Sequence, residues 1–96
     1  MGVDITPFVG PAFRLLRERL EISQEELAFR AELDRTYVSG IERGRRNPSL
    51  KSMQRVAAVL NLSLDQVFVL ARKLAEKGAE QHRVKPKVAR SAKKTR

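Results

Sequence analysis

Apolar residues recur three and four positions apart along most of this 96-residue chain, which is the spacing of one face of an α-helix. No stretch alternates between apolar and polar residues in the way a half-buried strand does. The pattern therefore predicts an all-α fold of five helices. Their expected ranges are 11–20, 24–31, 35–43, 50–60 and 64–76.

Residues that suit helix ends stand beside these ranges. The expected N-caps are Ser23, Asp34, Ser49 and Ser63. Glu26 and Gln66 stand three residues after the first and the last of these caps, which matches the capping box, where side chains satisfy unpaired backbone groups. Pro11 suits the first turn of the first helix, and Gly44 suits the left-handed residue that follows the third.

The connection between the second and third helices is only three residues long: Glu32, Leu33 and Asp34. So short a turn between two short amphipathic helices predicts the steep crossing of a helix-turn-helix. A left-handed backbone is common at the first turn position. If Glu32 adopts that conformation, we expect about 1 kcal/mol of strain.

The third predicted helix has a face that the core does not need. Val38 and Ile41 point inward, and the residues left outward or on a flank are Arg35, Thr36, Tyr37, Ser39 and Arg43. In a helix-turn-helix the N-terminus of this helix enters the major groove, where Arg35 can bond guanine O6 and N7 and Thr36 can meet a thymine methyl or a base edge. Gly40 is expected to leave room for the duplex. The alternative is an ordinary solvated face.

Groups that suit DNA phosphates are expected on both sides of that helix. Free backbone amides and the helix dipole at the start of the second helix attract a phosphate, and a basic loop that ends at Pro48 follows the third helix. The expected backbone-binding residues are Ser23, Gln24, Arg43, Arg45 and Asn47. One arginine of this loop is expected to reach a base or the minor groove. A merely solvated loop is the alternative.

The segment SQEELAFRAELDRTYVSGIERGRRNPSLKSMQRVAAVLNLSLDQVF resembles the DNA-binding domain of the Cro/CI phage-repressor family, and the resemblance covers roughly residues 8–74. Within that family, LDRTYVSGIERGRRN is similar to the controller proteins of restriction-modification systems. The resemblance implies a five-helix lambda-repressor-like domain, with the helix-turn-helix at helices two and three, that binds double-stranded DNA as a homodimer without a cofactor or small-molecule ligand.

The resemblance also implies roles for particular residues. Arg17 and Glu42 match an internal ion pair that joins helix one to helix three, and Gln24 matches a glutamine that anchors the DNA backbone and helix three. Arg35, Thr36, Tyr37 and Arg46 match operator contacts. With the outward face included, the expected base-reading residues are Arg35, Thr36, Tyr37, Ser39 and Arg46.

The fifth predicted helix is more apolar than one core-facing side requires. The residues that suggest a dimer interface are Leu64, Val67, Phe68, Leu70, Ala71 and Leu74. A two-fold dimer would place two reading helices about one DNA turn apart, roughly 34 Å, on a pseudo-palindromic operator. The alternative is that this helix simply completes the core of a monomer.

Charge divides the chain into two regions. Residues 1–76 hold twelve Lys/Arg and ten Asp/Glu, whereas residues 77–96 hold eight and one, so most of the net +9 lies in the second region. Residues 1–76 are therefore expected to form the domain, and residues 77–96, with Pro86 and few apolar residues, a disordered basic tail. Such a tail would add attraction for phosphate, and a merely solvated tail is the alternative.

Other classes of function find little support in the composition. There is no cysteine, one histidine (His82), no phosphate-binding glycine loop and no apolar run near 18 residues, so we expect no enzyme, metal site or membrane span, and a cytoplasmic bacterial location. The resemblance to controller proteins implies a regulator that controls its own gene and an endonuclease gene, with RNA polymerase as a further candidate partner. The alternatives are a generic chromosomal or prophage repressor and an antitoxin-like protein-interaction module.

Overall fold

The computed structural model describes residues 2–88, with side chains described for residues 2–78, and within these residues it contains helices and no strand. The helices are α1 (Thr6–Arg19), α2 (Gln24–Ala31), α3 (Arg35–Glu42), α4 (Leu50–Val59) and α5 (Leu64–Val88). The predicted all-α, five-helix fold is confirmed.

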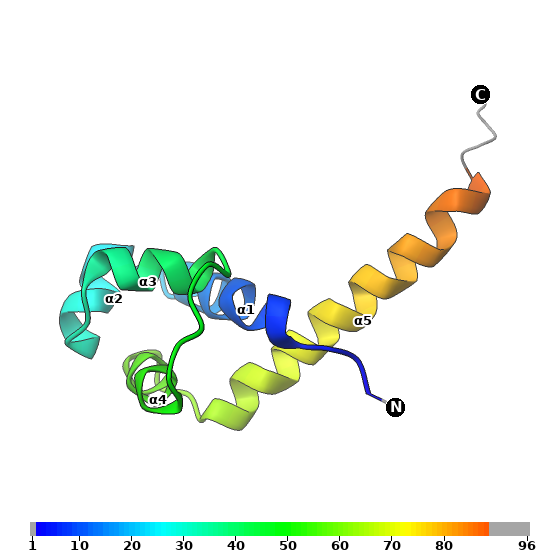
Figure 1. Cartoon of the computed structure of the whole chain (residues 1–96). Helices are drawn as coiled ribbons and strands as arrows, with labels where there is room; N and C mark the ends of the chain where they lie inside the picture. Colours follow the sequence, from blue (N-terminus) through cyan, green and yellow to red (C-terminus); the bar gives the residue numbers. More distant parts are fainter. Residues whose placement is uncertain (1, 89–96) are drawn as a thin grey trace.

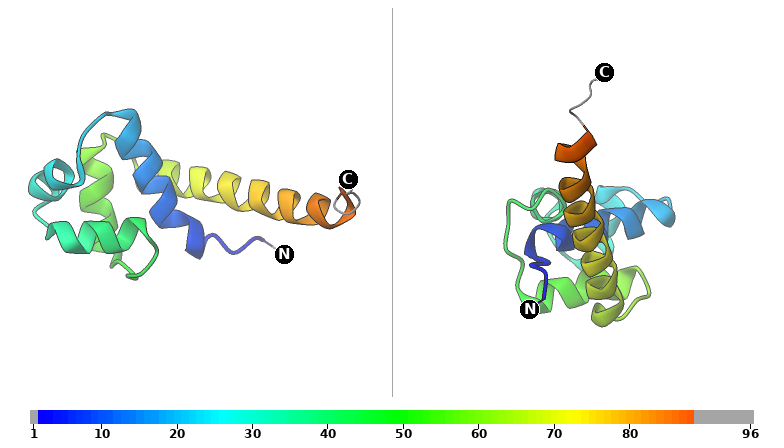
Figure 2. Two further views of the ribbon diagram at one scale, coloured as in Figure 1. Left: turned by 90° about the horizontal axis from the view of Figure 1, so that it is seen from above. Right: turned by 90° about the vertical axis from the view of Figure 1, so that its right-hand side faces the viewer.

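The helices enclose one core. α1 packs against α5 and α3, α2 packs against α3 and α4, and α4 meets α5. Each helix supplies one of the largest fully buried side chains, which are Phe13, Leu27, Val38, Val56 and Val67. Figure 1 shows α2 and α3 together at one end of the molecule, while α5 runs past α1 and away from them. The second half of α5 projects clear of the other helices (Figure 2).

Serine side chains begin two of the helices as predicted. Ser23 Oγ accepts a hydrogen bond from the backbone N–H of Glu26 at 3.0 Å, and Ser49 Oγ caps α4 in the same way. The box at α2 is only half formed, because the Glu26 carboxylate accepts from Arg30 instead of the Ser23 backbone. Asp34 occupies the predicted N-cap position of α3, but its side chain makes no capping hydrogen bond.

α1 begins five residues before its predicted start, because a different proline occupies its first turn. Pro7 is in that turn and Pro11 lies inside the helix, so the interpretation of Pro11 was wrong. Asp4 accepts a hydrogen bond from the backbone N–H of Thr6 at 3.0 Å. This bond lowers the pKa of the Asp4 carboxyl below its usual value and supports the earlier helix start.

α5 continues twelve residues past its predicted end at residue 76. The backbone of residues 77–88, for which the sequence predicted disorder, is drawn as the end of α5, and this segment is rich in helix formers such as Ala, Glu, Gln, Lys and Arg. The ring of Phe8 in α1 also lies beside Gly78. Residues 89–96 and the side chain of His82 lie outside the described residues, and the division into a domain and a basic tail stays a prediction.

Candidate nucleic-acid interface

The turn between α2 and α3 has the backbone geometry of a helix-turn-helix. Glu32 lies in the left-handed region at φ 59°, as considered from the sequence, and the backbone N–H of Leu33 donates to the carbonyl of Ala28 at 2.9 Å. Leu33 packs against the core. This turn ends α2 and starts α3 at a new angle, and α3 runs from the α2 end of the molecule back toward α1 (Figure 1).

α3 places two predicted base-reading residues at its exposed N-terminus. Val38 and Ile41 are 1% and 3% exposed, which fixes the inner face of the helix. Arg35 and Thr36 are exposed in the first turn, and neither side chain makes a hydrogen bond or ion pair with another residue of the described part of the chain. Both side chains are therefore available to a ligand.

Ser39 is less available than predicted. Its side chain is half-buried, and its Oγ accepts a hydrogen bond from Arg43 Nη2 at 2.9 Å. The bond holds the Arg43 side chain back along α3. The serine hydroxyl can still donate its own proton to an acceptor on DNA.

The loop after α3 folds back onto the helix. The backbone N–H groups of Arg45 and Arg46 both donate to the carbonyl of Gly40, at 2.8 and 3.3 Å, and Gly44 takes the predicted left-handed conformation at φ 74°. Gly40 is buried beneath the Arg46 side chain, so the prediction that it leaves room for DNA is wrong. Arg45, Arg46 and Asn47 remain exposed.

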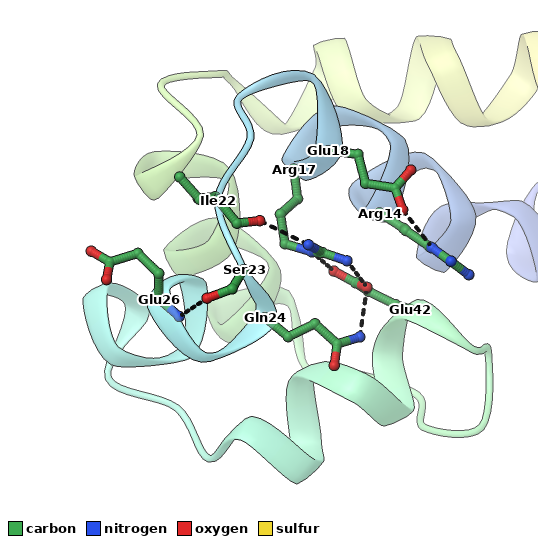
Figure 3. Close-up of polar contacts among 8 residues, drawn as sticks. All are labelled: Arg14, Arg17, Glu18, Ile22, Ser23, Gln24, Glu26 and Glu42. Atoms are coloured by element: carbon green, nitrogen blue, oxygen red, sulfur yellow. Dashed lines mark hydrogen bonds and ion pairs between the residues drawn. The ribbon is translucent and has the colours of Figure 1, made fainter.

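A buried ion pair supports this surface from beneath (Figure 3). Arg17 Nε donates to Glu42 Oε2 at 2.7 Å and Arg17 Nη2 donates to Glu42 Oε1 at 3.0 Å, with the side chains 11% and 2% exposed. Arg17 Nη1 also donates to the carbonyl of Ile22 at 2.8 Å. The hydrogen bond to Glu42 raises the pKa of Arg17. The pair thus neutralises the carboxylate at the end of α3.

Gln24 and Ser23 lie at the start of α2, and Gln24 contacts the ion pair. Gln24 Nε2 donates to Glu42 Oε1 at 2.9 Å, so the Gln24 amide links α2 to α3 (Figure 3). With the Ser23 hydroxyl bound to the Glu26 backbone, the remaining backbone N–H groups of the first turn are the phosphate donors that this end can offer.

One functional position was missed by sequence analysis. A Cβ on Gly10 would overlap the backbone oxygen of Ile41, so the absence of a side chain lets α1 cross α3 closely. That approach brings Arg17 within reach of Glu42. In the sequence Gly10 is only a glycine beside the predicted start of the first helix, and its meaning depends on knowing which helix crosses there.

The six residues predicted for the dimer interface do not lie on one surface. Val67 and Ala71 are completely buried within the protomer, so their assignment to an interface is wrong. The other four, Leu64, Phe68, Leu70 and Leu74, are half-buried. Val69 is 43% exposed and was not predicted.

Two searches for other kinds of site gave negative results. Within residues 2–88, no helix combines the length and the apolar character needed to cross a membrane. Among the side chains of residues 2–78, no three of His, Cys, Asp or Glu gather where they could hold a metal ion.

Two helices joined by a three-residue turn on a shared core, with the second helix exposed at its N-terminus, define a helix-turn-helix DNA-binding domain. The chain belongs to the helix-turn-helix family, whose model matches residues 13–67. The predicted similarity to Cro/CI-type repressors and restriction-modification controllers is confirmed. The chain is a helix-turn-helix transcription regulator.

Three relatives illustrate this similarity. The control protein C.MunI of a Mycoplasma species is 42% identical over 55 residues, which cover 57% of this chain and 74% of that protein. The structure of the restriction-modification controller C.AhdI from Aeromonas hydrophila matches with a TM-score of 0.63 and 40% identity, over 65% of this chain and 94% of that one. The clp gene regulator ClgR from Corynebacterium glutamicum matches with a TM-score of 0.81 and 26% identity, over 84% and 86%.

Proposed function

We propose that this protein is a controller of a restriction-modification system that binds a pseudo-palindromic operator as a homodimer. The observation that carries the proposal is the exposed pair Arg35 and Thr36 at the N-terminus of α3, a helix whose C-terminal carboxylate, Glu42, is neutralised by Arg17. A carboxylate left bare at Glu42 would repel DNA phosphates. With that charge compensated, α3 presents cationic and hydroxyl groups to the groove.

Each exposed group has a distinct task in this proposal. Arg35 bonds guanine O6 and N7, and Thr36 contacts the neighbouring base edge. Arg46 reaches a base or the minor groove from the loop, where Arg45 and Asn47 bind phosphates. The backbone amides at the start of α2 hold a further phosphate and set the register of the domain on the duplex.

The homodimer is proposed to form through one flank of α5. Phe68 is half-buried on one flank, where it lines a groove of about 460 Å³ together with Ile5 and Met53 of its own chain. Leu70 and Leu74 lie one helical turn apart on the other flank and stay half-buried. A second copy packed against this flank would complete their burial.

Sedimentation of a Leu70→Glu variant tests this interface. The wild-type chain should sediment with the mass of two copies and the variant with the mass of one. The matched control is Val69→Glu, which adds the same charge at an exposed position and should leave the dimer intact. A Leu70→Glu protein that keeps its dimer mass while folded would contradict the proposed interface.

The DNA sequence bound by the full chain can be found by selection from a library of random duplexes. The proposal predicts an enriched pseudo-palindrome whose half-sites lie about 34 Å apart along the helix axis, or roughly one turn of DNA. Enrichment of a single unpaired half-site would contradict the dimeric mode. Failure to enrich any sequence would contradict sequence-specific reading altogether.

The resemblance to ClgR supports a second candidate, a chromosomal regulator outside any restriction-modification locus, because that match covers more of this chain than the C.AhdI match does. A reporter driven by the chain's own promoter separates the two. A controller should activate the reporter at low protein level and repress it at high level. Repression at every level would favour the chromosomal regulator.

A further inference from the structure

The backbone of Arg46 is fixed relative to α3. Its N–H and that of Arg45 share the carbonyl of Gly40 as acceptor, at 3.3 and 2.8 Å. The left-handed conformation of Gly44 makes this reversal of the chain possible. These hydrogen bonds thus hold the backbone from which the Arg46 side chain extends against the last turn of α3.

The missing side chain of Gly40 determines the path of the Arg46 stem. A Cβ on Gly40 would lie 2.6 Å from Arg46 Cγ, and 3.6 and 3.7 Å from its Cβ and Cδ. The close atom belongs to the middle of the arginine side chain, so an added methyl group would rotate the whole side chain away from α3. Glycine is unfavourable inside a helix, and this contact explains its presence there.

Tyr37 supports the other end of the same side chain. It lies three residues before Gly40, hence on the same face of α3, and packs against the core. The Arg46 guanidinium carbon lies 5.7 Å from the centroid of the Tyr37 ring, within the range of a cation–π contact. Within the described part of the chain the guanidinium makes no hydrogen bond or ion pair, so its donors remain available.

We infer that Tyr37 and Gly40 are positioning residues that hold Arg46 over α3 before DNA arrives. Tyr37 contributes to binding through Arg46, in place of the base-reading role expected from sequence. Pre-ordering a long, flexible side chain lowers the conformational entropy lost on binding. The inference rests on the proposed DNA-binding function, and its first test is independent of DNA.

That first test is the proton chemical shifts of the Arg46 side chain in the free protein. Because the side chain lies over an aromatic face, its methylene protons should be shifted upfield in the wild type and in Tyr37→Phe, which keeps the ring. The shifts should move toward random-coil values in Tyr37→Leu and in Gly40→Ala. Wild-type shifts retained in both of these variants would overturn the inference.

The second test is a double-mutant cycle with the selected duplex. Tyr37→Leu and Gly40→Ala should each weaken binding by about three- to tenfold, the size of a cation–π contact, and Tyr37→Phe should stay near wild type. In an Arg46→Ala background the same substitutions should have no further effect, because the side chain they position is gone. Additive losses would show that Tyr37 contacts DNA itself and would overturn the inference.

The design separates this inference from the proposed function. If selection yields no preferred duplex, the proposed function fails, while the chemical shifts still decide whether Tyr37 and Gly40 position Arg46. Gly40→Ala is expected to fold, because alanine favours the helix and its added methyl group meets a side chain and not the backbone. Circular dichroism spectra that match the wild type establish that each variant is folded.

Discussion

Removal of the Glu42 carboxylate should destabilise the protein far more than removal of an exposed one. In Glu42→Ala, the Arg17 side chain, 11% exposed, loses two of its charged hydrogen bonds and keeps only the carbonyl of Ile22. Gln24 loses its acceptor as well. Leaving one member of a buried ion pair without its partner costs about 3–5 kcal/mol. That is a large share of the roughly 5–15 kcal/mol that stabilises a domain.

Urea unfolding followed by circular dichroism measures this loss. The unfolding midpoint should fall with little change in the slope, and the melting temperature should fall by about 12 °C or more for a domain of this size. The matched control is Glu18→Ala, which breaks the exposed Arg14–Glu18 pair, with side chains 59% and 50% exposed. Such surface pairs contribute about 0.2–1 kcal/mol.

A double variant tests the cause of the loss. Arg17→Met with Glu42→Leu removes both charges and fills their space with apolar groups, so it should recover most of the stability lost in Glu42→Ala. Equal small losses in Glu42→Ala and Glu18→Ala would refute the reasoning. So would a double variant less stable than Glu42→Ala, because the loss would then come from packing and not from an uncompensated charge.

Three further predictions concern local structure. Gly10→Ala should lower the free energy of unfolding by about 2 kcal/mol, because its Cβ meets the backbone of α3, whereas Gly2→Ala, with open space around it, should have no effect on urea unfolding. Glu32→Gly should raise the stability by about 1 kcal/mol by relieving the left-handed strain at φ 59°, and an unchanged or lower midpoint would contradict this. The lowered pKa of Asp4 implies that its contribution to α1 is present above the pKa of the unfolded chain, about 3.9, and is lost as the pH falls through the lower folded value. The amide proton of Thr6 should report this loss by NMR in the wild type and remain constant with pH in Asp4→Asn.

The parts of the fold that depend on neighbouring residues were predictable from the sequence. Apolar spacing located α2, α3 and α4 to within one residue, helped at α2 and α4 by the serine caps, since both signals act within a few positions. The start of α1 and the C-terminal end of α5 were not found. At the start of α1, Pro7 and Pro11 each suit a first helical turn. At the end of α5, helix propensity favours a longer helix, whereas the low apolar content favours an earlier end.

Contacts between distant segments were beyond local patterns. The Arg17–Glu42 pair was expected only through a family resemblance, because nothing near either residue identifies its partner. Gly10 and Gly40 gained their meaning from the chain that crosses them. An apolar pattern likewise shows that a helix is buried, but not whether its own chain or a second copy covers it, and Val67 was therefore wrongly assigned to an interface.

The central claim is that the N-terminus of α3 reads a DNA sequence. Its most direct test compares the affinities of wild type and Arg35→Ala for the selected duplex and for a scrambled duplex of the same base composition. All four affinities are measured at the same salt concentration. Loss of a bidentate guanine contact should weaken binding to the selected duplex by about 5- to 150-fold. The affinity for the scrambled duplex should fall no further in Arg35→Ala than in Arg72→Ala, which removes an equal charge from an exposed position on α5. An Arg35→Ala protein that keeps its preference for the selected duplex would contradict the account.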